Sequence, residues 1–167
     1  PYPAFDLYPQ LDYICLTTSR GCPFRCIYCA SPLLSKGFMR RDPLKVVEEI
    51  EYWTTNYRIN NIAFYDDALL VGSFEYFIPM MKEIIARGIQ CNFHTPNALH
   101  IREINEEIAK LLFQSGFKTI RLGFETSNEK TQIETGGKVN NKEFQRTVKW
   151  LKKAGYSGKE IGVYIMA

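Results

Sequence analysis

The sequence predicts an α/β fold in which strands and helices alternate along almost the whole chain. Two observations carry this prediction. Short apolar segments rich in β-branched and aromatic residues recur five times. Longer segments with apolar residues three and four positions apart lie between them. Repeated βα units build parallel sheets, so the pattern fits either a doubly wound sheet or part of a barrel.

The predicted strands are the five short apolar segments. They cover residues 13–19, 61–66, 90–95, 118–124 and 160–166. The first reads "YICLTTS" and has the composition of a strand that is partly buried in a sheet. No helix follows the last segment, so we expect a sheet truncated after about the fifth strand, in a fragment of a longer protein.

The predicted helices carry start and stop signals. They cover residues 42–57, 73–88, 102–116 and 141–155. Asp42 can cap the first helix, and Pro43 suits its first turn. Pro79 lies inside the second, which predicts a kink or a later start. Gly116 and Gly155 end the third and fourth helices.

The first eleven residues differ from the rest of the chain. They contain three prolines and show no hydrophobic periodicity. We expect residues 1–11 to be a proline-rich lead-in or linker, and residues 12–167 to form one core domain. A chain of 167 residues is long enough for one domain with a substantial core.

The composition excludes several classes of protein. The net charge of +3 is too small to indicate nucleic-acid or membrane-surface binding. No apolar run is long enough to span a bilayer. Three of the five cysteines are crowded together, unlike the spacing of a secreted disulfide scaffold. A cytoplasmic protein that keeps its thiols for metal fits this pattern better.

Polar residues follow the predicted strands. Asp66 and Asp67 end the second strand, Asn97 lies just after the third, and Glu125 and Ser127 follow the fourth. Ligands of parallel α/β folds bind at the carboxyl ends of strands, so these side chains are expected to meet at one site. Taken singly, each is also compatible with a turn, a helix cap or a structural ion pair with an arginine.

Three cysteines follow the first strand in the stretch "RGCPFRCIYCASP". Cys22, Cys26 and Cys29 have Cys-x3-Cys-x2-Cys spacing, one ligand short of a structural zinc site or a four-cysteine iron–sulfur cluster. An open metal position is typical of a catalytic site. The other two cysteines of the chain fall in strands and are expected to be buried. The two histidines are expected to be ordinary polar residues.

The cysteine stretch, with Tyr28 as the aromatic residue before the last cysteine, resembles the signature loop of the radical S-adenosylmethionine (SAM) enzymes. The resemblance covers nearly the whole chain and implies a partial (β/α)6 TIM-like barrel. It implies that the three cysteines bind a [4Fe–4S] cluster whose open iron is chelated by SAM. Such enzymes cleave SAM reductively to a 5′-deoxyadenosyl radical, which takes hydrogen from a substrate.

The resemblance also implies roles for the other candidate residues. Tyr28 would lie near the adenine, and Asp66 or Asp67 would face the SAM amino group. Glu125 and Ser127 would contact the methionine or ribose part. Asn97 is a further candidate SAM contact. The partners implied are a small-molecule substrate that the sequence does not identify and an electron donor of the flavodoxin or ferredoxin type.

The sequence around these motifs, including "HTPNALH" and "SGFKTIRLGFETSN", resembles the cobalamin-binding branch of the family. That resemblance implies cobalamin bound by a domain outside this chain, and methylation or ring formation as the reaction. Two alternatives stay open. One is a non-catalytic module in which zinc or an iron–sulfur cluster staples the loop. The other is an enzyme like the methylthiotransferases, whose second cluster and RNA-binding module are not visible here.

Overall fold

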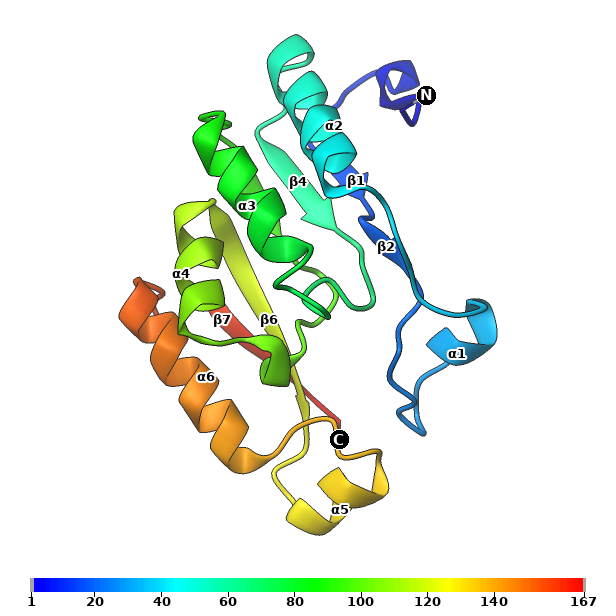
Figure 1. Cartoon of the computed structure of the whole chain (residues 1–167), viewed down its shortest axis with the longest axis vertical. Coiled ribbons are helices and arrows are strands. Elements are labelled where there is room, and N and C mark those ends of the chain that lie inside the picture. Colours follow the sequence, from blue (N-terminus) through cyan, green and yellow to red (C-terminus); the bar gives the residue numbers. More distant parts are fainter. Residues whose placement is uncertain (1, 167) are drawn as a thin grey trace.

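Five parallel strands form one sheet in the computed structural model, which describes residues 2–166 (Figure 1). In order across the sheet they are β1 (Ile14–Leu16), β4 (Asn61–Phe64), β5 (Asn92–His94), β6 (Phe117–Glu125) and β7 (Ile161–Ile165). This order is also their order in the chain. A doubly wound sheet reverses direction at a switch point, and no reversal occurs here. The fold is therefore a partial barrel of the TIM type.

The long helices form a single layer over one face of the sheet (Figure 1). They are α2 (Pro43–Asn56), α3 (Phe77–Ala86), α4 (Glu106–Gln114) and α6 (Asn141–Ala154). Each packs against the next along the chain, α2 on α3, α3 on α4 and α4 on α6. None of these helices, nor any other in residues 2–166, has the length and apolar character needed to cross a bilayer.

Local capping explains where the helices begin. The Asp42 carboxylate accepts a hydrogen bond from the Leu44 amide at 2.8 Å, as expected for the cap of α2. Asn140 and Glu143 form a reciprocal capping box at the start of α6. Of the two outcomes expected at Pro79, the later start is confirmed. Helix α3 begins only at Phe77, which leaves the proline in the first turn, where no backbone donor is needed.

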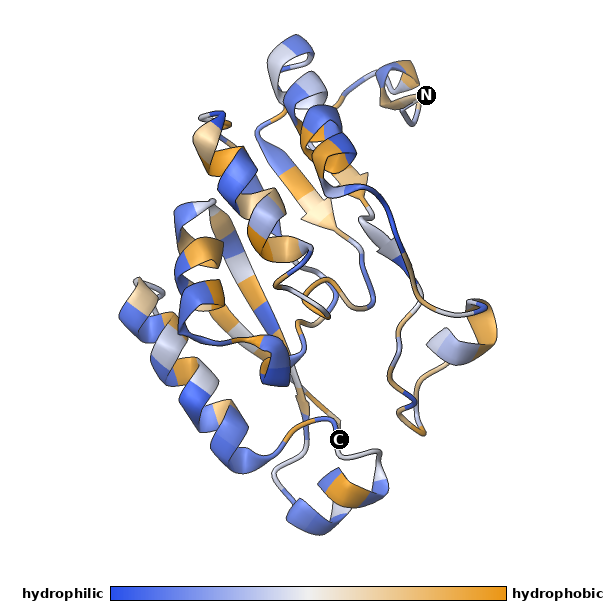
Figure 2. Ribbon diagram, in the orientation of Figure 1, coloured by the Kyte–Doolittle hydropathy of each residue, from blue (hydrophilic) through white to orange (hydrophobic). Residues whose placement is uncertain are grey.

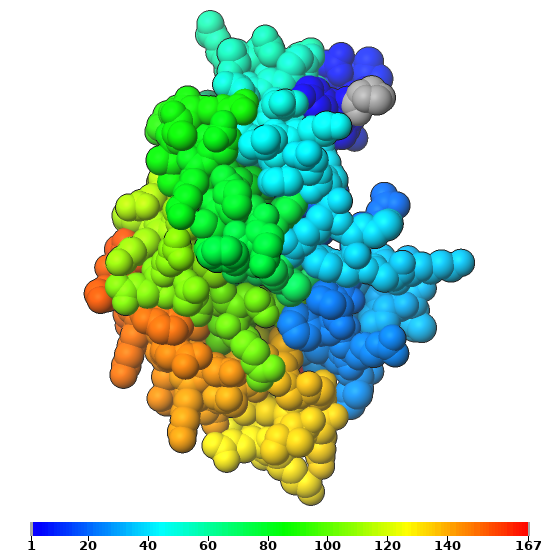
Figure 3. Space-filling model, viewed as in Figure 1, coloured from blue at the N-terminus to red at the C-terminus, as the bar shows by residue number. Residues whose placement is uncertain are grey.

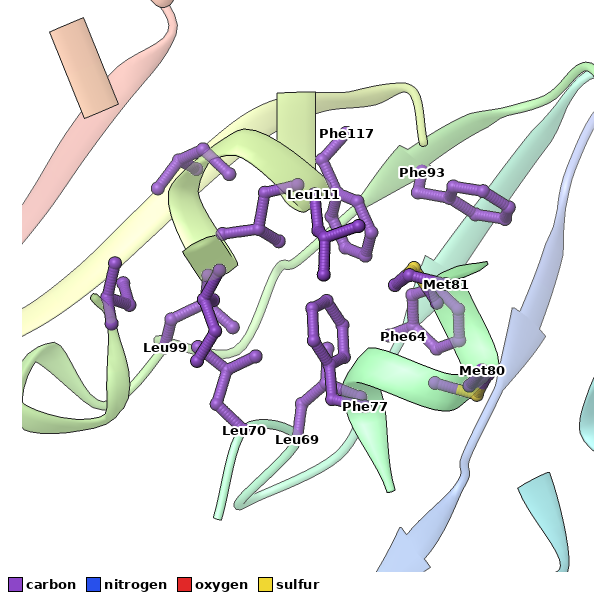
Figure 4. Packing of buried hydrophobic residues seen from close by; sticks show 14 of the residues in the cluster. Phe64, Leu69, Leu70, Phe77, Met80, Met81, Phe93, Leu99, Leu111 and Phe117 are labelled. Carbon is purple, nitrogen blue, oxygen red and sulfur yellow. The ribbon is translucent and has the colours of Figure 1, made fainter. Parts of the chain in front are cut away.

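The core lies between the sheet and this helix layer (Figures 2 and 4). Its centre is a group of phenylalanines from three neighbouring strands. The ring of Phe64 lies 5.4 Å from that of Phe93 and 5.7 Å from that of Phe117, measured between centroids. Phe77, Met80 and other residues of α3 close over them (Figure 4). Such rings bury large apolar areas and hold the strands in register.

The other face of the sheet is polar. The His94 ring lies within hydrogen-bond distance of Thr119 Oγ1 at 3.1 Å and of Asn61 Oδ1 at 3.2 Å. The expectation that Cys15 is buried is wrong. Its neighbours on β1 face the helices, so strand alternation turns Cys15 to the uncovered face. Cys91 is half-buried, and burial raises the pKa of its thiol to about 12.

Several small features were not predicted from the sequence. A two-stranded antiparallel sheet joins β2 (Ser19–Arg20) to β3 (Met39–Arg40), and short helices α1 (Ser31–Leu34) and α5 (Glu129–Glu134) lie in loops. In the expected lead-in, the ring of Phe5 packs edge-on against Trp53 of α2 at 5.3 Å. The division into a lead-in and a core domain stays a prediction.

Replacing Phe93 with alanine should lower the free energy of unfolding by about 3–5 kcal/mol, because this fully buried ring lies at the centre of the phenylalanine cluster. The matched control is Phe74→Ala, at a ring that is 76% exposed, which should change stability by less than about 0.5 kcal/mol. Urea unfolding followed by circular dichroism measures both. Equal losses would contradict the assignment of the core.

Candidate functional site

A cavity of about 290 Å³ opens at the carboxyl ends of the strands. It is lined by Cys22, Phe24, Cys26, Tyr28, Cys29, Ser31, Asp67, Pro96, Asn97, Ala98, His100, Glu125, Lys138 and Tyr164. These residues come from the segment after β2 up to the start of α1, from the loops after β4, β5 and α5, and from β6 and β7 themselves. Strand ends that are far apart in the sequence therefore meet at one place, as the parallel topology requires.

The cysteine loop is closed at its base by the β2–β3 pair. Gly21 has a left-handed backbone with φ of +81°, and a Cβ there would lie only 2.2 Å from the Gly37 carbonyl oxygen. The two ends of the loop can approach this closely only without a side chain at position 21. Inside the loop, the Cys29 amide donates to the Cys26 carbonyl at 3.0 Å, which forms a tight turn between two of the thiols.

The three thiols of the cysteine loop share one cavity. All three line the cavity and none is in a disulfide. Within residues 2–166, however, no three Cys, His, Asp or Glu side chains converge closely enough to hold one ion. Burial raises the pKa of the Cys22 thiol. A bound cation reverses that effect, since a coordinating thiol is deprotonated.

Asp66 is a structural clamp, and its side chain lies outside the cavity. It is 3% exposed and accepts hydrogen bonds from the amide and hydroxyl groups of Thr18 and Ser19 at the end of the first strand. Burial raises its pKa, while these hydrogen bonds act in the opposite direction. Since β4 precedes Asp66, this carboxylate ties the β4 end to the point where the chain enters the cysteine loop.

Asp67, the next residue, faces the cavity instead. Its carboxylate is exposed and accepts a hydrogen bond from the Ser31 hydroxyl at 2.7 Å. Ser31 follows the cysteine turn directly, so this contact joins the loop to the carboxyl end of β4. The two neighbouring aspartates therefore differ in role, one holding the backbone and one offering a negative charge to the cavity.

Glu125 and Lys138 also line the cavity and form an ion pair. Lys138 Nζ lies 2.8 Å from Glu125 Oε1, and the two side chains are 14% and 16% exposed. Glu125 has a φ of +70°, an uncommon and strained conformation for a residue with a side chain. A Cβ on Gly123 would lie 3.0 Å from Lys138 Nζ, so this glycine leaves the space that the pair occupies.

Lys138 and His100 were not identified from the sequence. Lys138 lies thirteen positions after Glu125, in a loop that reaches the site because Gly136 packs against the Cys26 backbone. The His100 ring packs against Phe24 in a tilted arrangement with centroids 4.6 Å apart, and its Nε2 lies 4.0 Å from Cys22 Sγ. Burial lowers the His100 pKa to about 4, so the ring is neutral at pH 7. Neither residue belongs to a local motif that reveals these contacts.

Of the remaining candidates, two line the cavity and one does not. Tyr28 forms part of the cavity wall, with Lys138 Nζ 5.8 Å from its ring centroid. Asn97 also lines the cavity, and its amide donates to the Tyr65 carbonyl at 3.0 Å. Ser127 is exposed and is not among the lining residues.

Comparison with known proteins agrees with this arrangement. The family model described as the radical SAM superfamily matches residues 16–167. An uncharacterized methyltransferase of Pyrococcus horikoshii is 27% identical over 163 residues, covering 93% of this chain and 35% of that protein. An anaerobic magnesium-protoporphyrin IX monomethyl ester cyclase of Cereibacter sphaeroides is 28% identical over 111 residues, covering 65% and 18%. The chain thus spans about a third or less of these relatives.

Solved structures show the same fold. The radical SAM methyltransferase TsrM from Kitasatospora setae, solved with cobalamin and a [4Fe–4S] cluster, superposes with a TM-score of 0.77 at 18% identity. The match covers 90% of this chain and 30% of TsrM. The cobalamin-dependent radical enzyme OxsB, with SAM bound, gives a TM-score of 0.70 at 15% identity, covering 90% and 23%.

Replacing Asp66 with alanine should lower the free energy of unfolding by about 3 kcal/mol or more, since several buried donors lose their acceptor at once. Asp67→Ala removes one exposed acceptor and should cost about 1 kcal/mol or less. Denaturant unfolding of the two variants checks this contrast. The clamp assignment is wrong if the two losses are the same.

Proposed function

The chain belongs to the radical SAM superfamily, and we propose that it forms the catalytic core of a radical SAM enzyme. One observation carries this proposal: three free thiols of the family's loop share a cavity with two acidic side chains, those of Asp67 and Glu125. When bound there, a [4Fe–4S] cluster and SAM supply the reductive cleavage that yields a 5′-deoxyadenosyl radical. The chain's own residues bind, orient and shield these groups.

In this proposal, Cys22, Cys26 and Cys29 supply three thiolates to the cluster and leave one iron open. His100 packs beside Cys22 as a neutral, buried ring. It excludes water from the cysteine loop and adds no charge. Hydrogen bonding and solvent exposure set the reduction potentials of iron–sulfur clusters. The low solvent exposure on the His100 side of the loop therefore contributes to the reduction potential of the cluster.

The charges on the cavity walls match the methionine part of SAM. Asp67 and Glu125 are hydrogen-bond acceptors for its amino group. Lys138 is the cationic residue in the cavity lining that can bind its carboxylate. Tyr28 offers a ring face to the adenine, and Asn97 a polar edge. Ser127 remains a candidate for the ribose. The buried clamp at Asp66 supports choosing Asp67 of the two aspartates.

We assign the chain to the cobalamin-binding branch, with cobalamin held by a domain outside residues 1–167. The support comes from relatives whose names include a methyltransferase and a tetrapyrrole cyclase, together with a fold shared with two cobalamin-dependent enzymes. The reaction class is methylation or ring formation on a small molecule. A flavodoxin- or ferredoxin-type protein in the cytoplasm supplies the electron.

Anaerobic reconstitution with iron and sulfide should give about four iron atoms per chain in the wild type. Cys26→Ala should lose most of this iron, because it removes one of three thiolates. The double variant Cys15→Ala/Cys91→Ala is the matched control, since neither thiol lines the cavity, and it should retain the iron. Iron analysis and electron paramagnetic resonance measure the outcome. Stoichiometric zinc with no affinity for SAM would instead support a structural staple.

Lys138→Met should weaken SAM binding to the cluster-loaded chain by about tenfold or more, since it removes a charged hydrogen-bond donor at nearly constant size. Lys130→Met, at a lysine 84% exposed on α5, should leave the dissociation constant unchanged. Isothermal calorimetry measures both.

A further control is needed because Lys138→Met leaves the Glu125 carboxylate without its ion-pair partner. The double variant Lys138→Met/Glu125→Gln also removes this unpaired negative charge. Unchanged affinity in both the single and the double variants would rule out a role for this ion pair in SAM binding.

A further inference from the structure

A second concave surface lies behind the cysteine loop. It has a volume of about 230 Å³ and is lined by Cys22, Pro23, Phe24, Arg25, Pro32, Ser35, Gly37 and Phe38. Cys22 and Phe24 line this groove and the strand-end cavity as well. The outer groove is therefore adjacent to the proposed SAM site, and Cys22 and Phe24 contribute to both.

Large apolar side chains stand exposed around this groove. Leu33 and Leu34 of α1 are 88% and 83% exposed, and Ile27, between two of the thiols, is 74% exposed. The cysteine loop and α1 project from the side of the molecule, away from the helix layer (Figures 1 and 3). Scattered exposed leucines are ordinary, but a cluster in one loop is typical of an interaction surface.

The same segment is entirely basic in charge. Between Asp12 and Asp42 the chain has no acidic residue but several arginines and lysines. Arg20, Arg25 and Lys36 are exposed, and within residues 2–166 none of the three lies at ion-pair distance from a carboxylate. The groove therefore combines an apolar centre with uncompensated positive charge, which is the complement of an acidic protein surface.

We propose that this groove, formed by the cysteine loop and α1, is the docking surface for an acidic one-electron carrier protein of the ferredoxin class. The inference rests on the proposed function, because the electron is passed to a cluster at the three cysteines. The carrier is oxidised by one electron and the cluster is reduced by one, with no bond made or broken. Opposite charges steer the encounter, and the exposed leucines hold the complex.

The test uses the cluster-loaded chain and an acidic plant-type [2Fe–2S] ferredoxin. Arg25→Gln/Lys36→Gln should lower the rate of ferredoxin-dependent cluster reduction about tenfold at low salt and reduce its dependence on salt. Leu33→Ser/Leu34→Ser should weaken ferredoxin binding, measured by calorimetry, by about tenfold. Dithionite, a small reductant that needs no docking surface, should reduce all variants at the wild-type rate.

Matched controls lie elsewhere on the surface. Lys149→Gln/Lys152→Gln removes two exposed charges from α6, and Leu7→Ser replaces a leucine that is 80% exposed. Both should behave as the wild type. If the loop variants match these controls, or if the wild type shows no salt-dependent binding, the docking proposal is overturned. If the wild type takes up no cluster, or dithionite cannot reduce it, the proposed function falls, and the docking proposal with it.

Discussion

The buried carboxylate of Asp66 is the contact on which the site depends. Two neighbouring strands, β1 and β4, end beside it, and it binds the backbone and hydroxyl groups of Thr18 and Ser19. From Ser19 the chain enters the cysteine loop, which the β2–β3 pair closes. The Ser31–Asp67 hydrogen bond and the contact of His100 with Phe24 also hold this projecting loop, but Asp66 is the residue that satisfies several buried donors at once.

The second constraint is the division of the sheet into two faces. The helix layer covers one face and buries the phenylalanine cluster against it, which provides most of the apolar burial. The other face carries polar side chains such as His94 and Thr119. The cavity lies at the carboxyl ends of the same strands. The main apolar core and the candidate site therefore occupy different parts of the sheet, the helix-covered face and the carboxyl ends of the strands.

Charge placement links the cavity to its proposed ligands. Asp67 and the Glu125–Lys138 pair put two negative groups and one positive group around the thiols, as a zwitterionic amino-acid moiety requires. The strained backbone at Glu125 is consistent with a position set by function, since strain of this kind persists only where surrounding contacts enforce it. The segment between Asp12 and Asp42, which forms the loop and the outer groove, carries only basic charges, which separates the ligand side from the proposed docking side.

The sequence by itself determined the βα alternation, the helix caps such as Asp42, and the three-cysteine loop, because these depend on local propensity and spacing. Only the tertiary structure decided which of two adjacent aspartates faces the cavity, since one peptide step turns a side chain to the opposite side. It also brought Lys138 and His100 to the thiols and exposed Cys15. These outcomes depend on contacts between distant segments and on which face of the sheet the helices cover, and no local pattern encodes either.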